Sequence, residues 1–387
     1  MKALVICGPI YPKQGNNATL LKKLFPYLLR ETDFKLLSAA GNTPNMRLPD
    51  SFGGVPVRWR TENQSGFRRR IAYPFLARLK DPKGFSDYLA ARLLLDEAKT
   101  IQKESRMGAV ISTMEPFPAA DAAGRLKDVK KRVLYLMDPP ACISNGRSTP
   151  YRDRRLKKIL AAQDAILTTP FIRRALAEHG YGQFDARIIP VGFPLIEGHG
   201  VSRRRADDGR IHLLFCGWLY SDIRSPRYFL DVFSRLDERF SVTFMGRECD
   251  KLTERFDVQT KAELRTLPQQ PYETALQAMA DADILINIGN SVPVHMPSKT
   301  LEYINTGKPF VNFYKLEDCP TLYYTERYPL CLNLSERDPD LDAAAARFAE
   351  FCVRNKGKTV DHARLEAEYA DCTPEYIAQK ILDAIGE

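Results

Sequence analysis

The chain has 387 residues, 44% of them hydrophobic and 27% charged, with a formal net charge of +9. This length predicts two domains, and the composition is ordinary for a soluble globular protein. No apolar run reaches the roughly 18 residues of a membrane-spanning helix, and the cysteines and histidines show neither a C-x-x-C pair nor a metal-binding spacing, so we expect no bilayer span, disulfide framework or metal cluster.

Short apolar runs alternate with stretches of helical period, which is the pattern of doubly wound parallel sheets. In the first half this pattern predicts an amphipathic helix near Ala18–Leu29 and strands near Ala3–Cys7, Ala109–Ser112, Val133–Leu136, Ala165–Thr168 and Ile188–Pro190. The region from Gly53 to Lys83 is rich in Gly, Pro and Arg. We interpret it as a long surface excursion from the first domain.

A polar, basic stretch over residues 197–210 predicts a linker. The strands expected after it lie near Ile211–Cys216, Ser241–Met245, Ile284–Ile288, Pro309–Phe313 and Leu330–Leu332. We therefore predict a first domain over 1–196, the linker over 197–210 and a second domain over 211–372. A helix over 373–387 is expected to pack back on the first domain.

Ligand sites in such sheets lie at the carboxyl ends of the strands, so two facing domains would line one cleft. In the first domain, the loop before the helix lacks the G-x-G-x-x-G pattern of a dinucleotide site. Asn16 or Asn17 can cap that helix. Asp138 follows a predicted strand and is either a cleft residue or an aspartate that begins a turn before Pro139.

The most informative segment spans residues 294–311. Pro297 suits the first turn of a helix, where its missing N–H has no consequence. The free N–H groups over 298–300 would then point into the cleft and, with the charge of Lys299, favour a phosphate. Glu302 lies one turn further and can accept hydrogen bonds from a ribose diol. Its alternative is a solvated carboxylate or one member of a Lys–Glu pair.

The pattern P-S-K-x-x-E-Y-x-x-x-G-K-P over 297–309 resembles the donor-site signature of GT-B glycosyltransferases of the large retaining family numbered four. The resemblance to that family extends to further segments along the chain, residues 110–123, 137–139, 165–169, 189–192, 215–219 and 280–286. The resemblance implies an α/β GT-B fold, with two facing Rossmann-like domains, parallel sheets and an inter-domain cleft. It also implies transfer of a sugar from a nucleoside-diphosphate sugar to an acceptor hydroxyl, with retention at the anomeric carbon.

The resemblance assigns roles to individual residues. Glu302 would bind the ribose, residues 298–300 the phosphates, and Lys299 or Arg224 the diphosphate charge. With Asp138, which ends a predicted strand at the cleft side, Lys299 and Arg224 are the candidate catalytic residues. Further donor-binding candidates are Pro297, Ser298, Thr300, Gly217 and Trp218, and the loop touching acceptor and donor sugar is Gly15, Asn16 and Asn17. The sequence departs from the family at Val294, where a glutamate that contacts the donor sugar is common, and at Trp218, where an arginine is common.

Asp281 and Asp283 match the D-x-D pattern that holds a divalent metal in another glycosyltransferase fold. Here they close a predicted helix and precede a predicted strand, so we interpret them as structural. Lys299, Arg224 and the helix dipole can meet the phosphate charge, and the expected enzyme needs no metal and no cofactor beyond its donor substrate.

Basic residues gather over 68–83, 147–158 and 203–205, which indicates an anionic partner or a merely solvated face. In the first cluster the cations Arg68, Arg69, Arg70, Lys80 and Lys83 are interleaved with Ile71, Tyr73, Phe75, Leu76 and Leu79. This mixture is typical of an interfacial segment. The hypothesis is a cytoplasmic protein, peripheral at the inner face of a membrane, with a glycan or lipid-linked acceptor. The alternative is ordinary core flanked by arginines.

Three rival functions remain open. A sugar-nucleotide epimerase or phosphorylase on the same fold would need an acid–base set in the first domain, which the sequence does not show. A catalytically degenerate scaffold protein is favoured by Val294, because the glutamate that commonly contacts the donor sugar is absent at this position. Nucleic-acid binding has only the basic clusters in its favour, without a recognition motif, and is not expected.

Overall fold

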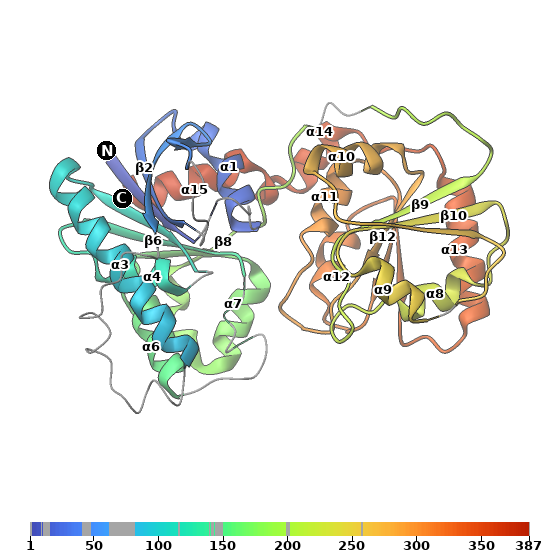
Figure 1. Ribbon diagram of the computed structural model, residues 1–387, viewed down its shortest axis with the longest axis horizontal. Coiled ribbons are helices and arrows are strands. Elements are labelled where there is room, and N and C mark those ends of the chain that lie inside the picture. The colour runs from blue at the N-terminus through green and yellow to red at the C-terminus, as the bar shows by residue number, and fades with distance from the viewer. Residues whose placement is uncertain are drawn as a thin grey trace. The chain divides into compact units, whose positions relative to one another are not determined.

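The computed structural model describes residues 2–8, 10, 16–40, 48–61, 82–114, 117–138, 140, 143, 150–198, 202–256 and 258–386. The chain forms two compact units, Met1–Pro194 together with Asp371–Glu387, and Leu195–Ala370 (Figure 1). In the described ranges, every helix is too short or too polar to cross a bilayer.

The first unit is built on a sheet whose described strands run in the order β3-β4-β2-β1-β5-β6-β7-β8. All neighbouring strands are parallel except β3 and β4, which are antiparallel. The strands are β1 (Lys2–Cys7), β2 (Asp33–Ala40), β3 (Ser51–Phe52), β4 (Val55–Thr61), β5 (Ala109–Thr113), β6 (Lys131–Leu136), β7 (Ala165–Thr168) and β8 (Ile188–Pro190).

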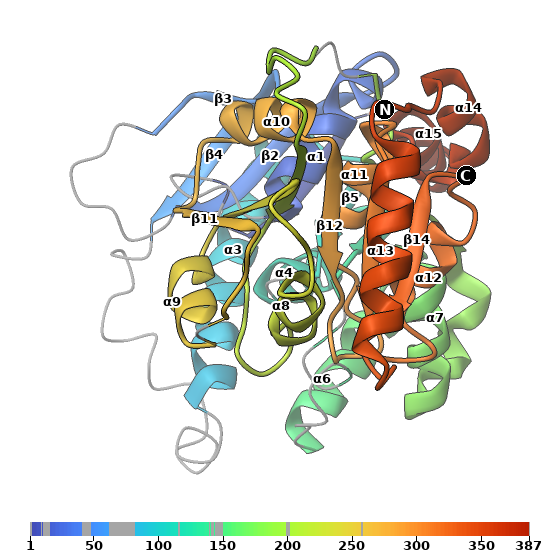
Figure 2. The same ribbon diagram turned by 90° about the vertical axis from the view of Figure 1, so that its right-hand side faces the viewer.

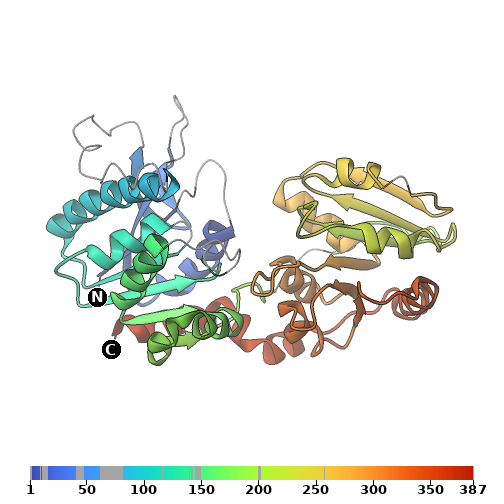
Figure 3. The same ribbon diagram turned by 90° about the horizontal axis from the view of Figure 1, so that it is seen from below.

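Helices cover both faces of this sheet. Buried leucines and alanines of α3 and α4 form a core with β1, β2 and β5, and α1 packs against α15, which also contacts β6. Figure 3 shows α15, from the end of the chain, beside the elements of the first unit. The helices are α1 (Asn16–Leu28), α3 (Pro82–Ser105), α4 (Phe117–Arg125), α6 (Pro150–Ala161), α7 (Pro170–Leu176) and α15 (Pro374–Gly386), with π- and 3-10-helical turns at Ala177–Tyr181 and Gly182–Arg187.

The second unit has a sheet in which all described strands are parallel, in the order β11-β10-β9-β12-β13-β14. They are β9 (Ile211–Cys216), β10 (Phe240–Met245), β11 (Glu263–Leu267), β12 (Ile284–Ile288), β13 (Phe310–Tyr314) and β14 (Cys331–Ser335). The strand order reverses between β9 and β12. In sheets of this kind ligands bind at that switch point, outside the carboxyl ends of the strands.

Two layers of helices enclose the second sheet (Figure 1). Buried side chains of α8, α9 and α13 form the core on one face, where α8 and α13 contact each other (Figure 2), and α10 and α11 cover the other face. The helices are α8 (Arg227–Phe233), α9 (Cys249–Glu254), α10 (Tyr272–Asp281), α11 (Lys299–Asn305), α12 (Pro320–Thr325), α13 (Leu341–Asn355) and α14 (His362–Glu368), followed by a 3-10 turn at Ala370–Cys372.

A ladder of asparagines crosses three neighbouring strands of this sheet. Asn287, Asn312 and Asn333 occupy paired register positions on β12, β13 and β14. The Asn287 amide donates to Asn312 Oδ1 at 2.7 Å, and the Asn312 amide donates to Asn333 Oδ1 at 2.8 Å. The hydroxyls of Thr321 and Thr325 complete this network. Amide side chains in such a network are compatible with burial because their hydrogen bonds are made inside the protein.

The predicted strands of both series are confirmed within a residue or two, except that β14 continues three residues beyond Leu332, and four strands were not predicted. β2 and the two-residue β3 were missed, and β4 lies inside the region from Gly53 that the sequence suggested was an excursion. β11 is an edge strand whose residues are all at least partly exposed, so it lacks the continuous apolar run of a buried parallel strand. Residues 62–81 of the expected excursion lie outside the described residues, and its last two residues, Pro82 and Lys83, begin a helix.

Seven of the eight cysteines belong to the described part of the chain, and all seven are free thiols, as predicted. Burial raises the pKa of Cys7 and of Cys249 to about 12, so both thiols are protonated and unreactive at neutral pH. Cys142 lies outside the described residues.

Candidate functional site

The candidate site lies at the carboxyl edge of the second sheet, where β12 leads into α11. Lys299 Nζ and Glu302 Oε2 form an ion pair at 2.5 Å, and both side chains are largely buried, with 22% and 14% exposed. Glu302 Oε1 receives no hydrogen bond from the described residues. One oxygen of the carboxylate therefore orients the lysine while the other stays available to a ligand.

The start of α11 differs from the prediction. Its N-cap is Ser298, so Pro297 precedes the cap instead of occupying the first turn. The Thr300 N–H is not free, because it donates to the Pro297 carbonyl at 3.0 Å. Thr300 Oγ1 is buried and has no hydrogen-bond partner among the described residues. With seven residues, α11 has only a small dipole, so most of the positive charge here belongs to side chains.

Tyr303 anchors α11 to the sheet. Its hydroxyl accepts from Cys216 N–H at 2.9 Å and donates to Cys216 O at 3.2 Å, at the last residue of β9. Burial raises the pKa of Tyr303 well above its usual value, so it stays a neutral phenol. Sequence reasoning gave this residue no role, although a tyrosine directly after Glu302 in the motif was a usable signal.

Arg224 is the second cation of the site and is 8% exposed. Its Nε donates to Asn290 Oδ1 at 2.9 Å, and its Nη1 contacts the Trp218 carbonyl at 3.3 Å. Burial lowers the pKa of Arg224 to about 10, so the group remains charged at neutral pH. No carboxylate of the described residues pairs with it. A buried cation without a counter-ion is costly alone and favours a bound anion.

Asn290 and His295, which the sequence did not suggest, support Arg224. The Asn290 amide donates to His295 Nδ1 at 2.7 Å and to the His295 carbonyl at 2.8 Å, which fixes the Asn290 oxygen toward the guanidinium. Burial, and secondarily the nearby Arg224, lower the pKa of His295 below 6.5, so the ring is neutral at pH 7 and its nitrogen can accept.

Gly217 and Trp218 follow β9 directly at the same edge. Gly217 N–H donates to Met245 O at 2.9 Å, and its Cα lies close to Arg224, since a Cβ there would be 3.9 Å from Nη1. Trp218 is 40% exposed and stacks on Tyr220, with ring centroids 4.6 Å apart. The structure thus brings the donor-site candidates of the second unit to one edge of one sheet.

A further buried carboxylate follows β14 at this edge. Glu336 lies 3.5 Å from Lys315, and its side chain is 12% exposed. Burial raises its pKa from 4.5 to about 7, with Lys315 opposing that shift. In the described part of the chain, this pair forms no hydrogen bond or ion pair with a donor-site candidate.

The D-x-D carboxylates lie at the opposite, amino edge of the sheet. Asp283 Oδ1 binds Arg203 at 2.5 Å and its Oδ2 accepts from His212 N–H at 2.9 Å. Asp281 Oδ1 accepts from the backbone N–H groups of Arg204 and Arg205. Both carboxylates thus anchor the stretch expected to be a linker. Among the described residues, no group of three His, Cys, Asp or Glu side chains is arranged to hold a metal ion.

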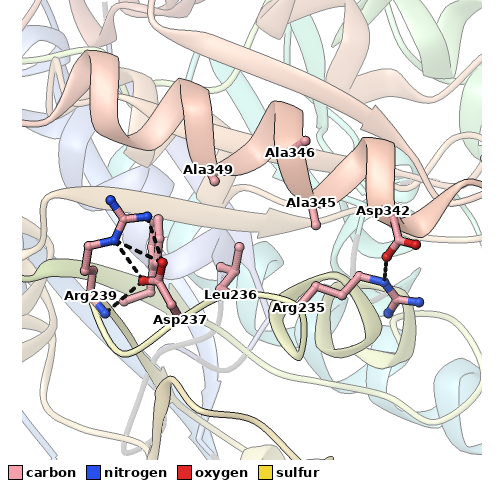
Figure 4. Close-up of a pocket in the computed structure, with 9 residues that line it drawn as sticks. Arg235, Leu236, Asp237, Arg239, Asp342, Ala345, Ala346 and Ala349 are labelled. Carbon is pink, nitrogen blue, oxygen red and sulfur yellow. Dashed lines mark hydrogen bonds and ion pairs between the residues drawn. The ribbon is translucent and has the colours of Figure 1, made fainter.

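The same amino edge has a hollow of about 280 Å³ between α13 and the start of β10 (Figure 4). Alanines of α13 line it, and two ion pairs flank it, Arg235 with Asp342 at 2.6 Å and Arg239 with Asp237 at 2.7 Å. Because its charged groups already have partners, this hollow is a poor candidate for the reaction.

In the first unit, Asp138 follows β6 at the carboxyl edge of the sheet. Burial raises the pKa of its carboxyl above the usual value. The buried Tyr135 hydroxyl, close enough to feel this charge, has no hydrogen-bond partner among the described residues. Gly15 lies outside the described residues, and Asn16 and Asn17 begin α1 without described side chains.

The basic clusters are only partly described. Residues 62–81, which carry Arg68, Arg69 and Arg70, lie outside the described residues. In the second cluster, Arg155 pairs with Asp121 at 3.1 Å and so is not a free surface charge. In the third, Arg203 binds Asp283, as described above.

Comparison with known proteins adds to this geometry. No protein-family model and no curated protein matches the chain. Solved structures match over its whole length. The lipopolysaccharide outer core galactosyltransferase WaaB aligns with TM-score 0.63 and 12% identity, covering 100% of this chain and 99% of that chain. HepE from Anabaena, in complex with UDP and glucose, aligns with TM-score 0.64 and 14% identity, covering 100% of both chains.

Sucrose-phosphate synthase from Thermosynechococcus elongatus also aligns, with TM-score 0.64 and 12% identity over 99% of this chain and 97% of that chain. These full-length matches show that the chain has the GT-B fold, with two α/β units whose sheets are mostly parallel. The predicted fold class is therefore confirmed. Membership of family four stays a prediction.

Proposed function

We propose that this protein is a glycosyltransferase that moves a sugar from a nucleoside-diphosphate sugar to an acceptor hydroxyl. The observation that carries the proposal is the buried Arg224 guanidinium, without a carboxylate partner in the described residues, at the same sheet edge as the Lys299–Glu302 pair. The two cations, Arg224 and Lys299, can bind the two phosphates of a diphosphate. The Glu302 carboxylate can accept hydrogen bonds from a ribose diol through Oε1. The GT-B match to HepE, which was solved with UDP-glucose, supports this interpretation.

In the proposed reaction the nucleoside diphosphate is the leaving group. Arg224 and Lys299 would stabilise the negative charge that develops on it, assisted by the N–H groups of Ser298 and Lys299. Glu302 would accept hydrogen bonds from the ribose through Oε1. These groups are fixed before the substrate binds, since Asn290 holds Arg224 and Tyr303 anchors the helix. Little reorganisation is then needed during the reaction.

The donor assignment is tested by thermal stabilisation with a panel of nucleotide sugars, followed by calorimetry and a transfer assay. A ligand at 100 times its Kd adds about 2.7 kcal/mol to the free energy of unfolding. Glu302→Gln should weaken donor binding about 10- to 100-fold, whereas Glu350→Gln, on the exposed face of α13, should not. Binding without transfer or donor hydrolysis would favour a scaffold, and release of an altered sugar nucleotide would favour an epimerase.

We further propose that the reaction is independent of metal and retains the anomeric configuration. The support for metal independence is that Asp281 and Asp283 bind the chain's own donors at the amino edge. Full activity in EDTA is expected, and loss of activity that Mn²⁺ restores would revive the D-x-D alternative. Retention rests on the family resemblance alone, and NMR of the freshly formed product tests it.

The first unit is proposed to bind the acceptor, a glycan or lipid-linked glycan, with Asp138 and the loop of Gly15, Asn16 and Asn17 near the reacting hydroxyl. Asp138→Asn should lower turnover while leaving nucleoside-diphosphate affinity within about twofold, because the diphosphate contacts belong to the second unit. An equal loss of turnover and of nucleoside-diphosphate affinity would contradict the assignment of the acceptor to the first unit and the diphosphate to the second.

Cytoplasmic membrane association is proposed from the sequence of residues 68–83. Each Lys or Arg near an anionic leaflet contributes about 1 kcal/mol, so three arginines together matter. The wild type should float with anionic liposomes at low salt, and changing Arg68, Arg69 and Arg70 to Ser should abolish flotation. The matched control changes exposed Lys99, Lys103 and Lys127 to Ser. Flotation that survives the arginine changes would refute the anchor.

A further inference from the structure

Two loops interlock at the carboxyl edge of the second sheet. Gly246 follows β10 with φ +145°, and a Cβ on it would lie 1.8 Å from the Gly217 carbonyl oxygen, so only glycine fits. A hydrogen bond of 3.2 Å from Leu219 N–H to Arg247 O ties the next residues together. The backbone therefore places positions 218 and 247 side by side.

Arg247 uses this placement to lie over the indole of Trp218. Its guanidinium carbon is 4.6 Å from the ring centroid, and the other stacking partner of Trp218 is Tyr220. Arg247 is exposed, and no carboxylate of the described residues forms an ion pair with it. An arginine stacked on an aromatic ring is restrained in orientation but keeps its N–H groups for an anion.

Arg239 provides the contrast at the other end of the same strand. It too lies over an aromatic ring, that of Phe240, at 6.0 Å. However, two of its nitrogens bind the Asp237 carboxylate, with distances from 2.7 to 3.0 Å. Arg239 therefore has its anion within the chain, and Arg247 does not.

Arg247 also belongs to the same electrostatic neighbourhood as Arg224. Both guanidiniums lie close enough to Tyr220 to lower its pKa, although burial is the larger effect and raises it. Asp222 is the carboxylate that faces the same tyrosine, and it acts in the opposite sense. The edge of the sheet thus has two guanidiniums near Tyr220, with one carboxylate beside them.

We propose that Arg247 is a diphosphate-binding residue, positioned by Trp218, and that it supplies the guanidinium that position 218 itself lacks. This inference rests on the proposed function, since it assumes a nucleoside-diphosphate ligand. Arginine is suited to the role because its planar fork can bind two phosphate oxygens while its face stays on the indole. Trp218 is then a positioning residue for the cation.

The experiment compares full-length variants by calorimetry. The probe is whichever of UDP, GDP, ADP, CDP and dTDP stabilises the wild type most, together with the corresponding nucleoside. Arg247→Ala should weaken the diphosphate about tenfold or more, as for loss of a hydrogen bond to a charged group. Nucleoside affinity should stay within about twofold, and Arg247→Lys should recover part of the loss. The matched control, Arg239→Ala, should leave both affinities unchanged.

Trp218 is tested by a double-mutant cycle. Trp218→Ala should also weaken diphosphate binding. The double variant should lose little more affinity than the weaker-binding single variant, because both changes remove the same Arg247–Trp218 stack. Additive losses would overturn the positioning role, and an unchanged diphosphate affinity in Arg247→Ala would overturn the whole inference. Equal loss of nucleoside affinity would do the same, since it would indicate general damage. If no diphosphate binds the wild type, the proposed function fails and this inference fails with it.

Discussion

Tyr303→Phe removes one oxygen atom from a buried position and should destabilise the second unit measurably. The hydroxyl makes two hydrogen bonds to Cys216, one to N–H and one to C=O, and the tyrosine is fully buried. Phenylalanine would leave both backbone groups without this partner and out of contact with water. Each unsatisfied buried group costs about 1–3 kcal/mol, so we expect a total loss of about 2–4 kcal/mol.

The assay is urea unfolding followed by tryptophan fluorescence. The chain has two tryptophans, Trp59 in the first unit and Trp218 in the second, so a Trp59→Phe background reports on the second unit alone. The denaturation midpoint should fall with an unchanged slope, because the surface exposed on unfolding is the same. Tyr328→Phe is the matched control, since that hydroxyl makes one bond, to Lys308 O at 2.9 Å, and its loss should be about half as large.

A loss below about 0.5 kcal/mol for Tyr303→Phe, or one no larger than that for Tyr328→Phe, would refute the reasoning, because a net hydrogen bond contributes about 1 kcal/mol. The same variant should also weaken donor binding, as α11 carries Lys299 and Glu302. Unchanged stability together with weaker binding would mean that the hydroxyl acts on the ligand directly.

Three further outcomes are expected. Asp283→Asn should lower the free energy of unfolding by about 3 kcal/mol, because it leaves the Arg203 cation without its buried carboxylate; a loss under 1 kcal/mol in urea titration would argue against that pairing. Gly246→Ala should lower the free energy of unfolding by about 2 kcal/mol, and Tm by several degrees, because the φ of Gly246 and the nearby Gly217 carbonyl exclude a Cβ. An unchanged Tm would contradict the interlocked loops. Glu336 has a folded-state pKa raised from 4.5 to about 7, so between these pH values the folded state binds a proton that the unfolded state has lost. The free energy of unfolding should therefore fall as pH rises through that window, by up to about 3 kcal/mol relative to Glu336→Gln. Parallel pH dependences of stability for the wild type and Glu336→Gln would contradict this expectation.

Strands buried on both faces were predictable because they need a continuous apolar run. All six residues of β9 are buried, and its run Ile211–Cys216 was identified to the residue. β11 has no such run, since it is an edge strand with partly exposed side chains. β4 contains Pro56 and alternates with arginines, so local composition there indicated a loop while the sheet imposes a strand.

The candidate site also contains residues that local sequence predicts and residues that only the fold brings together. Lys299 and Glu302 are three positions apart along one short motif, so their pairing follows from helix geometry. Arg224 was identified, but its burial and its support by Asn290 depend on contacts 66 residues away in sequence. Arg247 could not be predicted, because only the fold brings it to Trp218. Local patterns therefore indicated the proposed ligand class, and tertiary contacts determine which cations lie at that edge of the sheet.

The asparagine ladder has a consequence for how this sequence can change over evolutionary time. If Asn312 alone became apolar, the amides of Asn287 and Asn333 would each lose a partner inside the sheet. Replacing the three asparagines together with Thr325, whose buried hydroxyl donates to Asn333, by apolar residues of similar volume avoids that penalty and can be neutral. These four positions should thus vary as a block among homologous chains, because each substitution alone leaves a buried polar group without a partner.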